Sequence, residues 1–270
     1  MSDLVGQVVV ITGGAGGIGM ALAQHLGNRG ASIVTADLQD SAVQEAVQRL
    51  QALNIEALGV TCDVTVAESV ERLAKRAFDW KGRADLLINN AGISQQSAKL
   101  HQADIADAKR VMDVNFWGVW HGCAAFGPLM ADQSHPSAIY NVGSENSLFC
   151  AVPRSAAYIA SKHAVLGLTE SFREDMPDHV HVGTIMPGWV TSGLSAKEVA
   201  HLAMPAAEFA DIVVPQMLAR ERFVVSHPYN VVRKEQRDQA IADSYARNAP
   251  RQDGDEAHDV RLLIAKMRSG

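Results

Sequence analysis

The chain has 270 residues, of which 47% are apolar and 20% are charged, and its formal net charge is −6. Such a chain is long enough for a sizeable core and has the composition of an ordinary soluble globular protein. The negative charge argues against nucleic acid or an anionic membrane as the main partner. Residues 1–7 lack the pattern of a signal peptide, and no uncharged apolar run of about 20 residues predicts a membrane span. The three widely spaced cysteines predict reduced thiols in a cytoplasmic protein, not a disulfide framework or a zinc site.

A glycine-rich turn lies between a predicted strand and a predicted helix near the start of the chain. Residues 8–12 are a continuous β-branched run, typical of a strand covered on both faces, and residues 20–26 have helical spacing. Glycines between such elements let the backbone turn sharply and approach a pyrophosphate at the helix N-terminus. A glycine-rich run alone is also typical of a flexible turn, but this order of elements predicts dinucleotide binding. We expect the contacts at Gly13, Gly17, Ile18 and Gly19.

An aspartate ends the second predicted strand, residues 31–37. In dinucleotide-binding folds an acid at this place accepts hydrogen bonds from the adenosine ribose and repels a 2′-phosphate. The next residue is Leu38, and neither it nor the glycine turn supplies a lysine or arginine to neutralise such a phosphate. Asp37 therefore predicts NAD over NADP. The alternative is that Asp37 caps the helix expected at residues 41–53.

Strands and helices alternate along most of the chain. Further strands are predicted at 55–64, 84–89, 138–142, 180–186 and 222–228, and helices at 66–80, about 104–130 and around 156–164. Such alternation implies right-handed crossovers and an α/β fold with a doubly wound parallel sheet between two layers of helices. No change of composition marks a second domain, so residues 1–270 are predicted to form a single one. A polar helix at about 231–247 and a short helix starting near 253–256 form an atypical extension from about residue 228, which caps the subunit or covers a neighbour.

A tyrosine and a lysine share one face of the predicted helix around 156–164. Tyr158 and Lys162 are four residues apart, which places them about 6 Å from each other on a helix. An ammonium at that distance favours the phenolate, so we expect the pKa of Tyr158 to be lowered and the side chain to accept a proton near neutrality. Many proteins carry such a pair for no chemical reason, and the pair alone is weak evidence.

Polar residues follow two strands at the carboxyl edge, where open α/β sheets bind their ligands. Residues 89–92, Asn-Asn-Ala-Gly, close one strand and either hold a cofactor or brace the sheet. Ser144 follows the strand at 138–142, and we expect it to face the same crevice as Tyr158. Asn115 lies inside the long helix, and because asparagine is a modest helix former it predicts a kink or a buried amide that satisfies nearby backbone.

These motifs resemble the short-chain dehydrogenase/reductase family over roughly residues 7–192. Thr12-Gly13-x-x-x-Gly17-x-Gly19 is similar to the family's cofactor motif, and Asn89-Asn90-Ala91-Gly92 is similar to its sheet-bracing motif. Tyr158-x-x-x-Lys162 is similar to its active-site pair, and Pro187-Gly188 matches the turn before its nicotinamide contacts. The resemblance implies a Rossmann-type fold, an NAD(P)-dependent oxidoreductase, and a homodimer or homotetramer built on the long helices.

The resemblance also implies a role for each matching residue. The catalytic set is Asn115, Ser144, Tyr158 and Lys162, with Asn115 in a water-linked proton relay and Lys162 on the nicotinamide ribose. The remaining implied cofactor contacts are Asp63 and Val64 at the adenine, Asn90, Ala91 and Gly92 at the sheet edge, and Pro187, Gly188, Val190 and Ser192 toward the nicotinamide.

The chain departs from the family pattern at the catalytic serine. That serine usually precedes the tyrosine by thirteen residues, and this position is Glu145 here. Ser144 fits the strand-end Asn-x-x-Ser pattern if the following loop carries a one-residue insertion. Ser147 is the weaker alternative.

The predicted reaction is the NAD-dependent interconversion of a secondary alcohol and a ketone. Apolar residues after Ser144 and Pro187 either line the crevice or belong to the core, and if they line it they suit an apolar cyclic or aromatic substrate. They are Leu148, Phe149, Cys150, Val152, Trp189, Leu194, Leu202, Met204 and Phe209. The alternatives are an NADPH-dependent carbonyl reductase and a catalytically silent dinucleotide-binding sensor or scaffold. Metal-dependent hydrolysis finds no support, because the ten histidines are scattered.

Overall fold

The computed structural model describes residues 4–192 and 200–269. Its internal contacts divide the chain into two units, Met1–Pro228 and Tyr229–Gly270. The boundary coincides with the start of the extension that the sequence predicts at about residue 228. That the whole chain forms a single domain stays a prediction.

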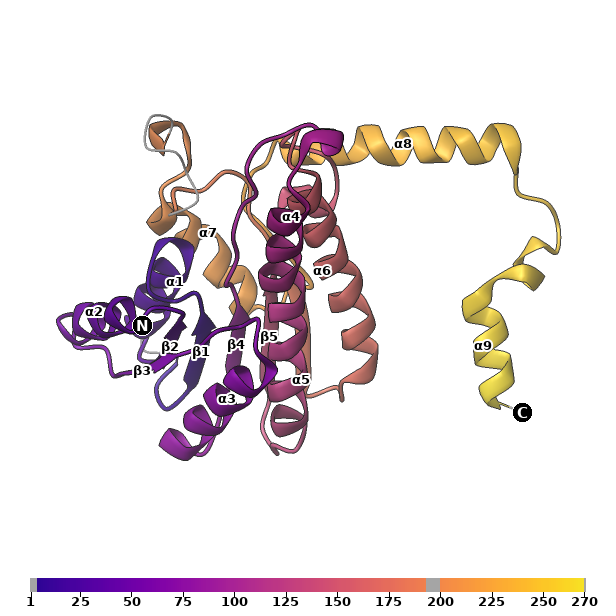
Figure 1. The fold of residues 1–270 in the computed structure, drawn as a ribbon. Helices are drawn as coiled ribbons and strands as arrows, with labels where there is room; N and C mark the ends of the chain where they lie inside the picture. The colour runs from indigo at the N-terminus through magenta and orange to yellow at the C-terminus, as the bar shows by residue number, and fades with distance from the viewer. Residues whose placement is uncertain (1–3, 193–199, 270) are drawn as a thin grey trace. The chain divides into compact units, whose positions relative to one another are not determined.

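A seven-stranded parallel sheet forms the centre of the first unit, in the order β3-β2-β1-β4-β5-β6-β7. Figure 1 labels the first five of these strands, from β3 to β5. This order confirms the predicted doubly wound α/β fold. The chain moves outward from β1 to β3 and then crosses back to β4, so the switch in direction lies between β1 and β4. The strands are β1 (Val8–Thr12), β2 (Ser32–Asp37), β3 (Ala57–Thr61), β4 (Leu86–Asn89), β5 (Ser137–Val142), β6 (Val180–Met186) and β7 (Phe223–Val225).

Helices cover both faces of this sheet, and each face has its own apolar core. One core joins the sheet to α1, α2 and α7, and the other joins it to α3, α5 and α6. Because both faces of the sheet are covered, every residue of β1 and β5 is buried, and their sequences show no alternation of apolar and polar residues. The helices are α1 (Gly17–Gly27), α2 (Asp40–Gln51), α3 (Ala67–Lys81), α4 (Ile105–Met112), α5 (Gly118–Ala131), α6 (Ala156–Asp175) and α7 (Ala206–Leu218).

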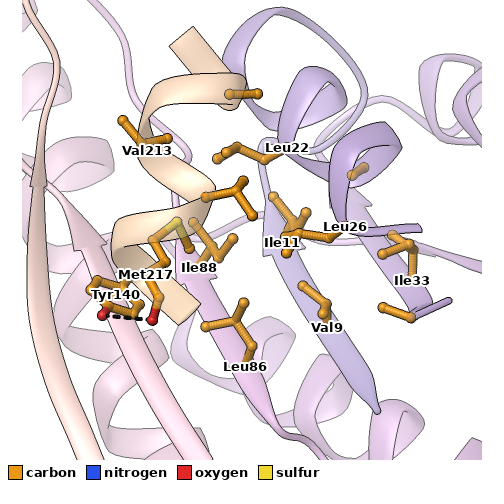
Figure 2. Packing of buried hydrophobic residues seen from close by; sticks show 14 of the residues in the cluster. Val9, Ile11, Leu22, Leu26, Ile33, Leu86, Ile88, Tyr140, Val213 and Met217 are labelled. Carbon is orange, nitrogen blue, oxygen red and sulfur yellow. Dashed lines mark hydrogen bonds between the residues drawn. The ribbon is translucent and has the colours of Figure 1, made fainter. Parts of the chain in front are cut away.

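Figure 2 shows the first of these cores, where Leu22 and Leu26 of α1 and Val213 of α7 meet side chains of the sheet. Tyr140 of β5 is fully buried there. Its hydroxyl lies 3.1 Å from the carbonyl oxygen of Met217 and 3.1 Å from that of Glu221. The phenol thus bonds the last turn of α7 and the residues after it to the centre of the sheet.

The second unit consists of α8 (Asn230–Asn248), a 3-10 turn at Asp255–His258 and α9 (Val260–Ser269). Both predicted helices of the extension are therefore present. Most side chains of α8 are polar and exposed, and pairs such as Gln239 with Asp243, at 2.7 Å, stabilise the helix.

Candidate active site

A cleft of about 950 Å³ opens at the carboxyl ends of the strands. Its wall contains most of the residues that the sequence predicts for the site: Gly13, Gly17, Ile18, Asp37, Asp63, Val64, Asn90, Ala91, Gly92, Ser144, Tyr158, Lys162, Pro187, Gly188, Val190 and Ser192. Among the described residues, Gly19 and Asn115 are the predicted members that lie behind this wall. Gly19 packs inside α1, where a Cβ would come within 2.3 Å of the Gly13 carbonyl oxygen.

The glycine turn has a backbone that glycine favours strongly. Gly13 and Gly17 have φ angles of +61° and +50°, in the left-handed region. A Cβ on Gly13 would also lie 2.8 Å from the Cα atom of Ala91. The turn therefore lies directly against the end of β4, with the N-terminus of α1 behind it.

Asn90 holds the turn in this place. Its amide nitrogen donates to the carbonyl oxygens of Thr12 at 2.9 Å and Gly13 at 3.0 Å. In return the Thr12 hydroxyl oxygen accepts hydrogen bonds from the backbone N–H groups of Asn90 and Ala91, at 3.0 and 3.1 Å. Asn90 is thus a brace between two strand ends, as the sequence suggests, and also part of the cleft wall.

The Asp37 carboxylate faces the glycine turn. Its Oδ2 atom accepts from the N–H of Ala15 at 3.2 Å, and its Oδ1 atom accepts from the N–H of Leu38 at 2.8 Å. Helix α2 begins after Gln39, so Asp37 is not at the position that caps the helix. Asp63 lies further along the same wall, where its Oδ1 atom accepts from the N–H of Thr65 at 2.9 Å.

The long helix predicted at 104–130 is irregular at Asn115. A π-helical segment, Asp113–Trp117, joins α4 to α5, in agreement with the predicted kink. The fully buried Asn115 amide accepts from the N–H of Ile93 at 2.8 Å and donates to the Ile93 carbonyl at 3.0 Å and the Ser161 hydroxyl at 3.1 Å. Asn115 therefore ties the strand-end segment after Gly92 to the helix that carries Tyr158.

Lys162 is buried beneath the cleft, and its ammonium points at the backbone. Its Nζ atom donates to the carbonyl oxygen of Val142 at 2.8 Å and lies 5.8 Å from the centroid of the Tyr158 ring. Burial lowers the pKa of Lys162 to about 8. The ammonium is therefore less stable here than in water.

The predicted direction of the Tyr158 pKa was wrong. The pKa of Tyr158 is raised, chiefly because burial disfavours the phenolate; a hydrogen bond with the Ser144 hydroxyl acts in the opposite direction. The nearby Glu145 carboxylate raises the Tyr158 pKa further. Helical spacing brings Lys162 near the phenol, but it does not measure how much solvent the fold removes from the ring.

The two serines that the sequence leaves open have different surroundings. The Ser147 hydroxyl donates to the carbonyl oxygen of Lys162 at 2.7 Å and accepts from the N–H of Ser144 at 3.2 Å. Both of these hydrogen bonds are made with backbone groups. The Ser144 hydroxyl lies in the cleft wall and acts to lower the pKa of Tyr158. This geometry favours Ser144.

Three polar residues with a role in the site escape the sequence-based prediction. The Gln95 side-chain oxygen accepts from the N–H of Tyr158 at 3.0 Å and so caps the first turn of α6. The Asn146 amide contacts Ser144, and the His227 ring accepts from the N–H of Gly188 at 3.2 Å. A Cβ on Gly188 would lie 2.5 Å from that ring. Their partners are distant in sequence or lie within an irregular loop, so no periodic pattern marks them.

Fewer of the proposed apolar residues line the cleft than the sequence analysis considered. Val152 and Trp189 line the cleft, together with Ile93 and Ala151. Phe209 belongs to the core under α7 and is fully buried, so the interpretation of this residue as core is the correct one. The other proposed members that the structure describes lie outside the cleft wall: Leu148, Phe149, Cys150, Leu202 and Met204. Leu194 lies outside the described residues.

The described residues provide neither a metal-ligand cluster nor a membrane-spanning helix. Within 4–192 and 200–269, the acidic, histidine and cysteine side chains form no group of three or more that would hold a metal ion. The helices described over these ranges are too short or too polar to cross a bilayer. All three cysteines are free thiols, with Cys62 and Cys123 buried and Cys150 exposed.

Known proteins resemble this chain in sequence and in fold. The model of a family described as short chain dehydrogenase matches residues 7–203. The 1-deoxy-11-beta-hydroxypentalenate dehydrogenase of Streptomyces arenae is 33% identical over 229 residues, which are 80% of each chain. A mitochondrial borneol dehydrogenase of Lavandula x intermedia is 35% identical over 71% of this chain and 72% of its own. A crystal structure of a Burkholderia phymatum short chain dehydrogenase/reductase in complex with NAD superposes with a TM-score of 0.84 at 27% identity, covering 93% of this chain and 100% of that one.

Proposed function

The chain belongs to the short-chain dehydrogenase/reductase family, which makes it an NAD(P)-dependent oxidoreductase acting on CH–OH groups, and on that premise we propose its finer function. The proposed reaction is the interconversion of an apolar cyclic or aromatic secondary alcohol and its ketone, with NAD as the coenzyme. One observation carries this proposal: the Tyr158 and Ser144 hydroxyls meet in the cleft above the Lys162 ammonium.

The cleft suits a dinucleotide. The positive φ angles of Gly13 and Gly17 leave the turn free of side chains where a pyrophosphate would approach, and a Cβ on Gly16 would enter open space. We assign the adenosine ribose to Asp37, the adenine to Asp63 and Val64, and the nicotinamide ribose to Lys162. The sheet-edge and nicotinamide-side contacts are those implied by the family motifs. When bound, NAD(P) supplies a carbon centre that accepts a hydride from the carbinol carbon or returns it to a ketone.

Side chains of the protein then transfer the hydroxyl proton of the alcohol. The Ser144 hydroxyl donates to the substrate oxygen and holds it beside Tyr158. During oxidation the Tyr158 oxygen takes the alcohol proton, and during reduction it returns it. The Lys162 ammonium lies 5.8 Å from the centroid of the Tyr158 ring, and we expect its charge to stabilise negative charge on the phenol oxygen, in opposition to the effect of burial. Asn115 keeps the segment after Gly92 and the helix of Tyr158 at a fixed separation.

NAD is favoured over NADP by the charge at the adenosine end. The Asp37 carboxylate lies at the glycine turn, and its neighbour Leu38 is exposed and uncharged. A 2′-phosphate there would meet an anion and find no cation from Leu38 or the turn. Initial rates with both coenzymes test this proposal. The rate with NAD should exceed the rate with NADP, and Asp37→Ala should reduce the ratio of the two rates. Equal or better use of NADPH by the unmodified protein supports a carbonyl reductase instead.

An apolar, cyclic substrate is supported by the cleft wall and by the relatives. Val152, Trp189, Ile93 and Ala151 give the substrate end an apolar lining. The relatives named above are dehydrogenases of cyclic alcohols according to their names. The test is NADH fluorescence over a panel of cyclic and aromatic secondary alcohols, with sugars and hydroxy acids as the comparison. Turnover restricted to the latter refutes the substrate class, and no turnover of any alcohol supports the sensor alternative.

Two further expectations concern the protein's state. We expect a homodimer or homotetramer, because Trp117 and Trp120 leave apolar surface exposed where α5 begins. We also expect it to work in the cytoplasm, where its free thiols stay reduced. Light scattering tests the first expectation, and cell fractionation tests the second.

A further inference from the structure

We infer that Asn146 is a positioning residue that fixes the Ser144 hydroxyl as a hydrogen-bond donor and ties it to the cleft segment at residues 151 and 152. The inference rests on the proposed function, because it assigns a role to a side chain beside the proposed catalytic serine. Asn146 is only 2% exposed, and the family motifs above give it no role.

The hydrogen bonds of Asn146 settle which way its amide faces. The side-chain oxygen accepts from the backbone N–H of Ala151 at 2.9 Å and from that of Val152 at 3.2 Å. Because both partners are donors, this atom must be the oxygen, and the NH2 group must face the other way. There it donates to the Ser144 hydroxyl oxygen at 3.2 Å.

The Ser144 oxygen receives a second bond from the same residue. The backbone N–H of Asn146 also donates to it, at 3.1 Å. A serine hydroxyl has two acceptor positions and one hydrogen. Asn146 fills both acceptor positions, so the remaining capacity of Ser144 is to donate its hydrogen.

Few acceptors compete for that hydrogen. The Pro187 carbonyl oxygen is 3.5 Å away, at the limit of a hydrogen bond. The Tyr158 oxygen is a second acceptor, and the lowering of the Tyr158 pKa by this contact agrees with donation from Ser144. A substrate oxygen in the cleft would receive the same hydrogen. Ser144 is then a donor prepared before substrate arrives, which is the arrangement that stabilises negative charge on oxygen most effectively.

The other end of Asn146 reaches the substrate wall. Ala151 and Val152 both line the cleft, and both bond the Asn146 oxygen through their backbone. The Asn146 side chain therefore sets the distance between the Ser144 hydroxyl and the part of the cleft wall at residues 151 and 152. A change at Asn146 should alter catalysis and leave the coenzyme contacts at the glycine turn and Asp37 unaffected, because Asn146 bonds neither of them.

Asn146→Asp is the most informative variant. It keeps the size and the acceptor for Ala151 and Val152, but its second oxygen accepts the Ser144 hydrogen and turns it away from the cleft. Groups that orient a catalytic side chain are worth about 10-fold to 100-fold in activity at metal sites, and we expect a similar fall in kcat here. The NAD dissociation constant should stay unchanged. Lowering the pH protonates the introduced carboxyl and restores a donor, so the ratio of variant to unmodified kcat should rise as the pH falls.

A double-mutant cycle with Ser144→Ala separates positioning from general damage. If Asn146 acts through Ser144, Asn146→Asp should change kcat little once the serine hydroxyl is absent. Asn141→Asp is the matched control, since Asn141 is also fully buried but bonds Asn89 and Thr169 beneath the cleft. Its effect should be the same with and without the Ser144 hydroxyl.

The outcomes are distinct. Additive effects of Asn146→Asp and Ser144→Ala, or a kcat ratio that is flat with pH, overturn the inference while leaving the proposed function intact. Failure of the unmodified protein to oxidise any secondary alcohol refutes the proposed function itself. If the Asp variant gives no cooperative melt, Asn146→Ala enters the same cycle, with the same non-additivity expected.

Discussion

The protein places one tyrosine in the sheet, on β5, and one on α6 at the cleft, and their surroundings differ. Tyr140 lies under α7 with its hydroxyl between the carbonyls of Met217 and Glu221 (Figure 2). Tyr158 lies in the cleft wall, where the Ser144 hydroxyl acts to lower its pKa and the Lys162 ammonium lies 5.8 Å from the centroid of its ring. Burial raises the pKa of both phenols. Desolvation is therefore common to both sites and does not make a tyrosine reactive.

The difference lies in what each hydroxyl bonds. Carbonyl oxygens only accept, so the Tyr140 proton is held where it is and its role is structural. Asn146 fills both acceptor positions of the Ser144 hydroxyl, so this hydroxyl can only donate toward Tyr158, and its hydrogen stabilises the phenol oxygen when the proton leaves. Access to the cleft then adds a substrate oxygen with which to exchange the proton. Four predictions test this comparison.

The largest effect is expected for Tyr158→Phe. Removal of the proton-transfer oxygen should lower kcat by at least about 10²–10⁴-fold, the usual contribution of general acid–base catalysis. The NAD dissociation constant, measured by fluorescence titration, should stay within a few-fold of the unmodified value. Retained turnover in this variant would show that another group carries the proton.

The next effect concerns the charge below Tyr158. The pKa of Lys162 is lowered from 10.5 to about 8 by burial. Between these two pH values the unfolded chain holds a proton that the folded protein has lost, so stability rises with pH across this window. Relative to Lys162→Met, which has no charge, the free energy of unfolding of the unmodified protein should rise by roughly 3 kcal/mol from pH 8 to pH 10.5. Urea denaturation of both proteins at several pH values measures it, and a constant difference contradicts it.

A smaller effect is expected at Gly188, in the turn that follows β6. A Cβ on Gly188 would lie 2.5 Å from the His227 ring, so Gly188→Ala should displace the turn. We expect the NAD dissociation constant to rise about 10-fold, or about 1.4 kcal/mol. The added mutation His227→Ala should reverse most of the loss by removing the ring.

Gly167→Ala is the matched control for this change. Its Cβ would meet nothing within 4 Å among the described residues, and it lies inside α6. It should leave NAD binding unchanged and add slightly to stability, because alanine is the better helix former. Equal losses at both positions would mean that the His227 contact is irrelevant.

The smallest effect is expected for Tyr140→Phe. This variant loses one buried hydrogen bond to the residues at the end of α7, worth about 1 kcal/mol of unfolding free energy. Activity should be retained, as measured with the same alcohol and NAD. A loss of activity comparable to that of Tyr158→Phe would remove the distinction between the two sites.

The sequence predicts the strands well where both faces are buried. β1 and β6 begin and end at the predicted residues, because both are rich in β-branched residues and almost wholly buried. The edge strand β3 is shorter than predicted, at Ala57–Thr61, and its residues are only partly buried. At an edge the apolar pattern is weaker, so it marks the ends of the strand less sharply.

Within the site, residues on motifs are predictable and residues that act through space are not. Gln95 bonds the backbone of Tyr158 across 63 positions, and His227 bonds Gly188 across 39. Neither contact follows from periodicity or from a turn signal. The raised pKa of Tyr158 is a second example, since burial of the ring depends on every element that surrounds it.

The π-helical segment at Asp113–Trp117 makes the position of Asn115 depend on the exact number of residues in this stretch. A π turn contains about one residue more than an α turn, so removing any single residue there would leave an unbroken regular helix from Ile105 to Ala131. The same deletion would rotate one half of the helix against the other and take the Asn115 amide away from Ile93 and Ser161. We therefore expect the shortened chain to have the more ideal helix and the less competent enzyme, a case in which local irregularity is retained for chemistry.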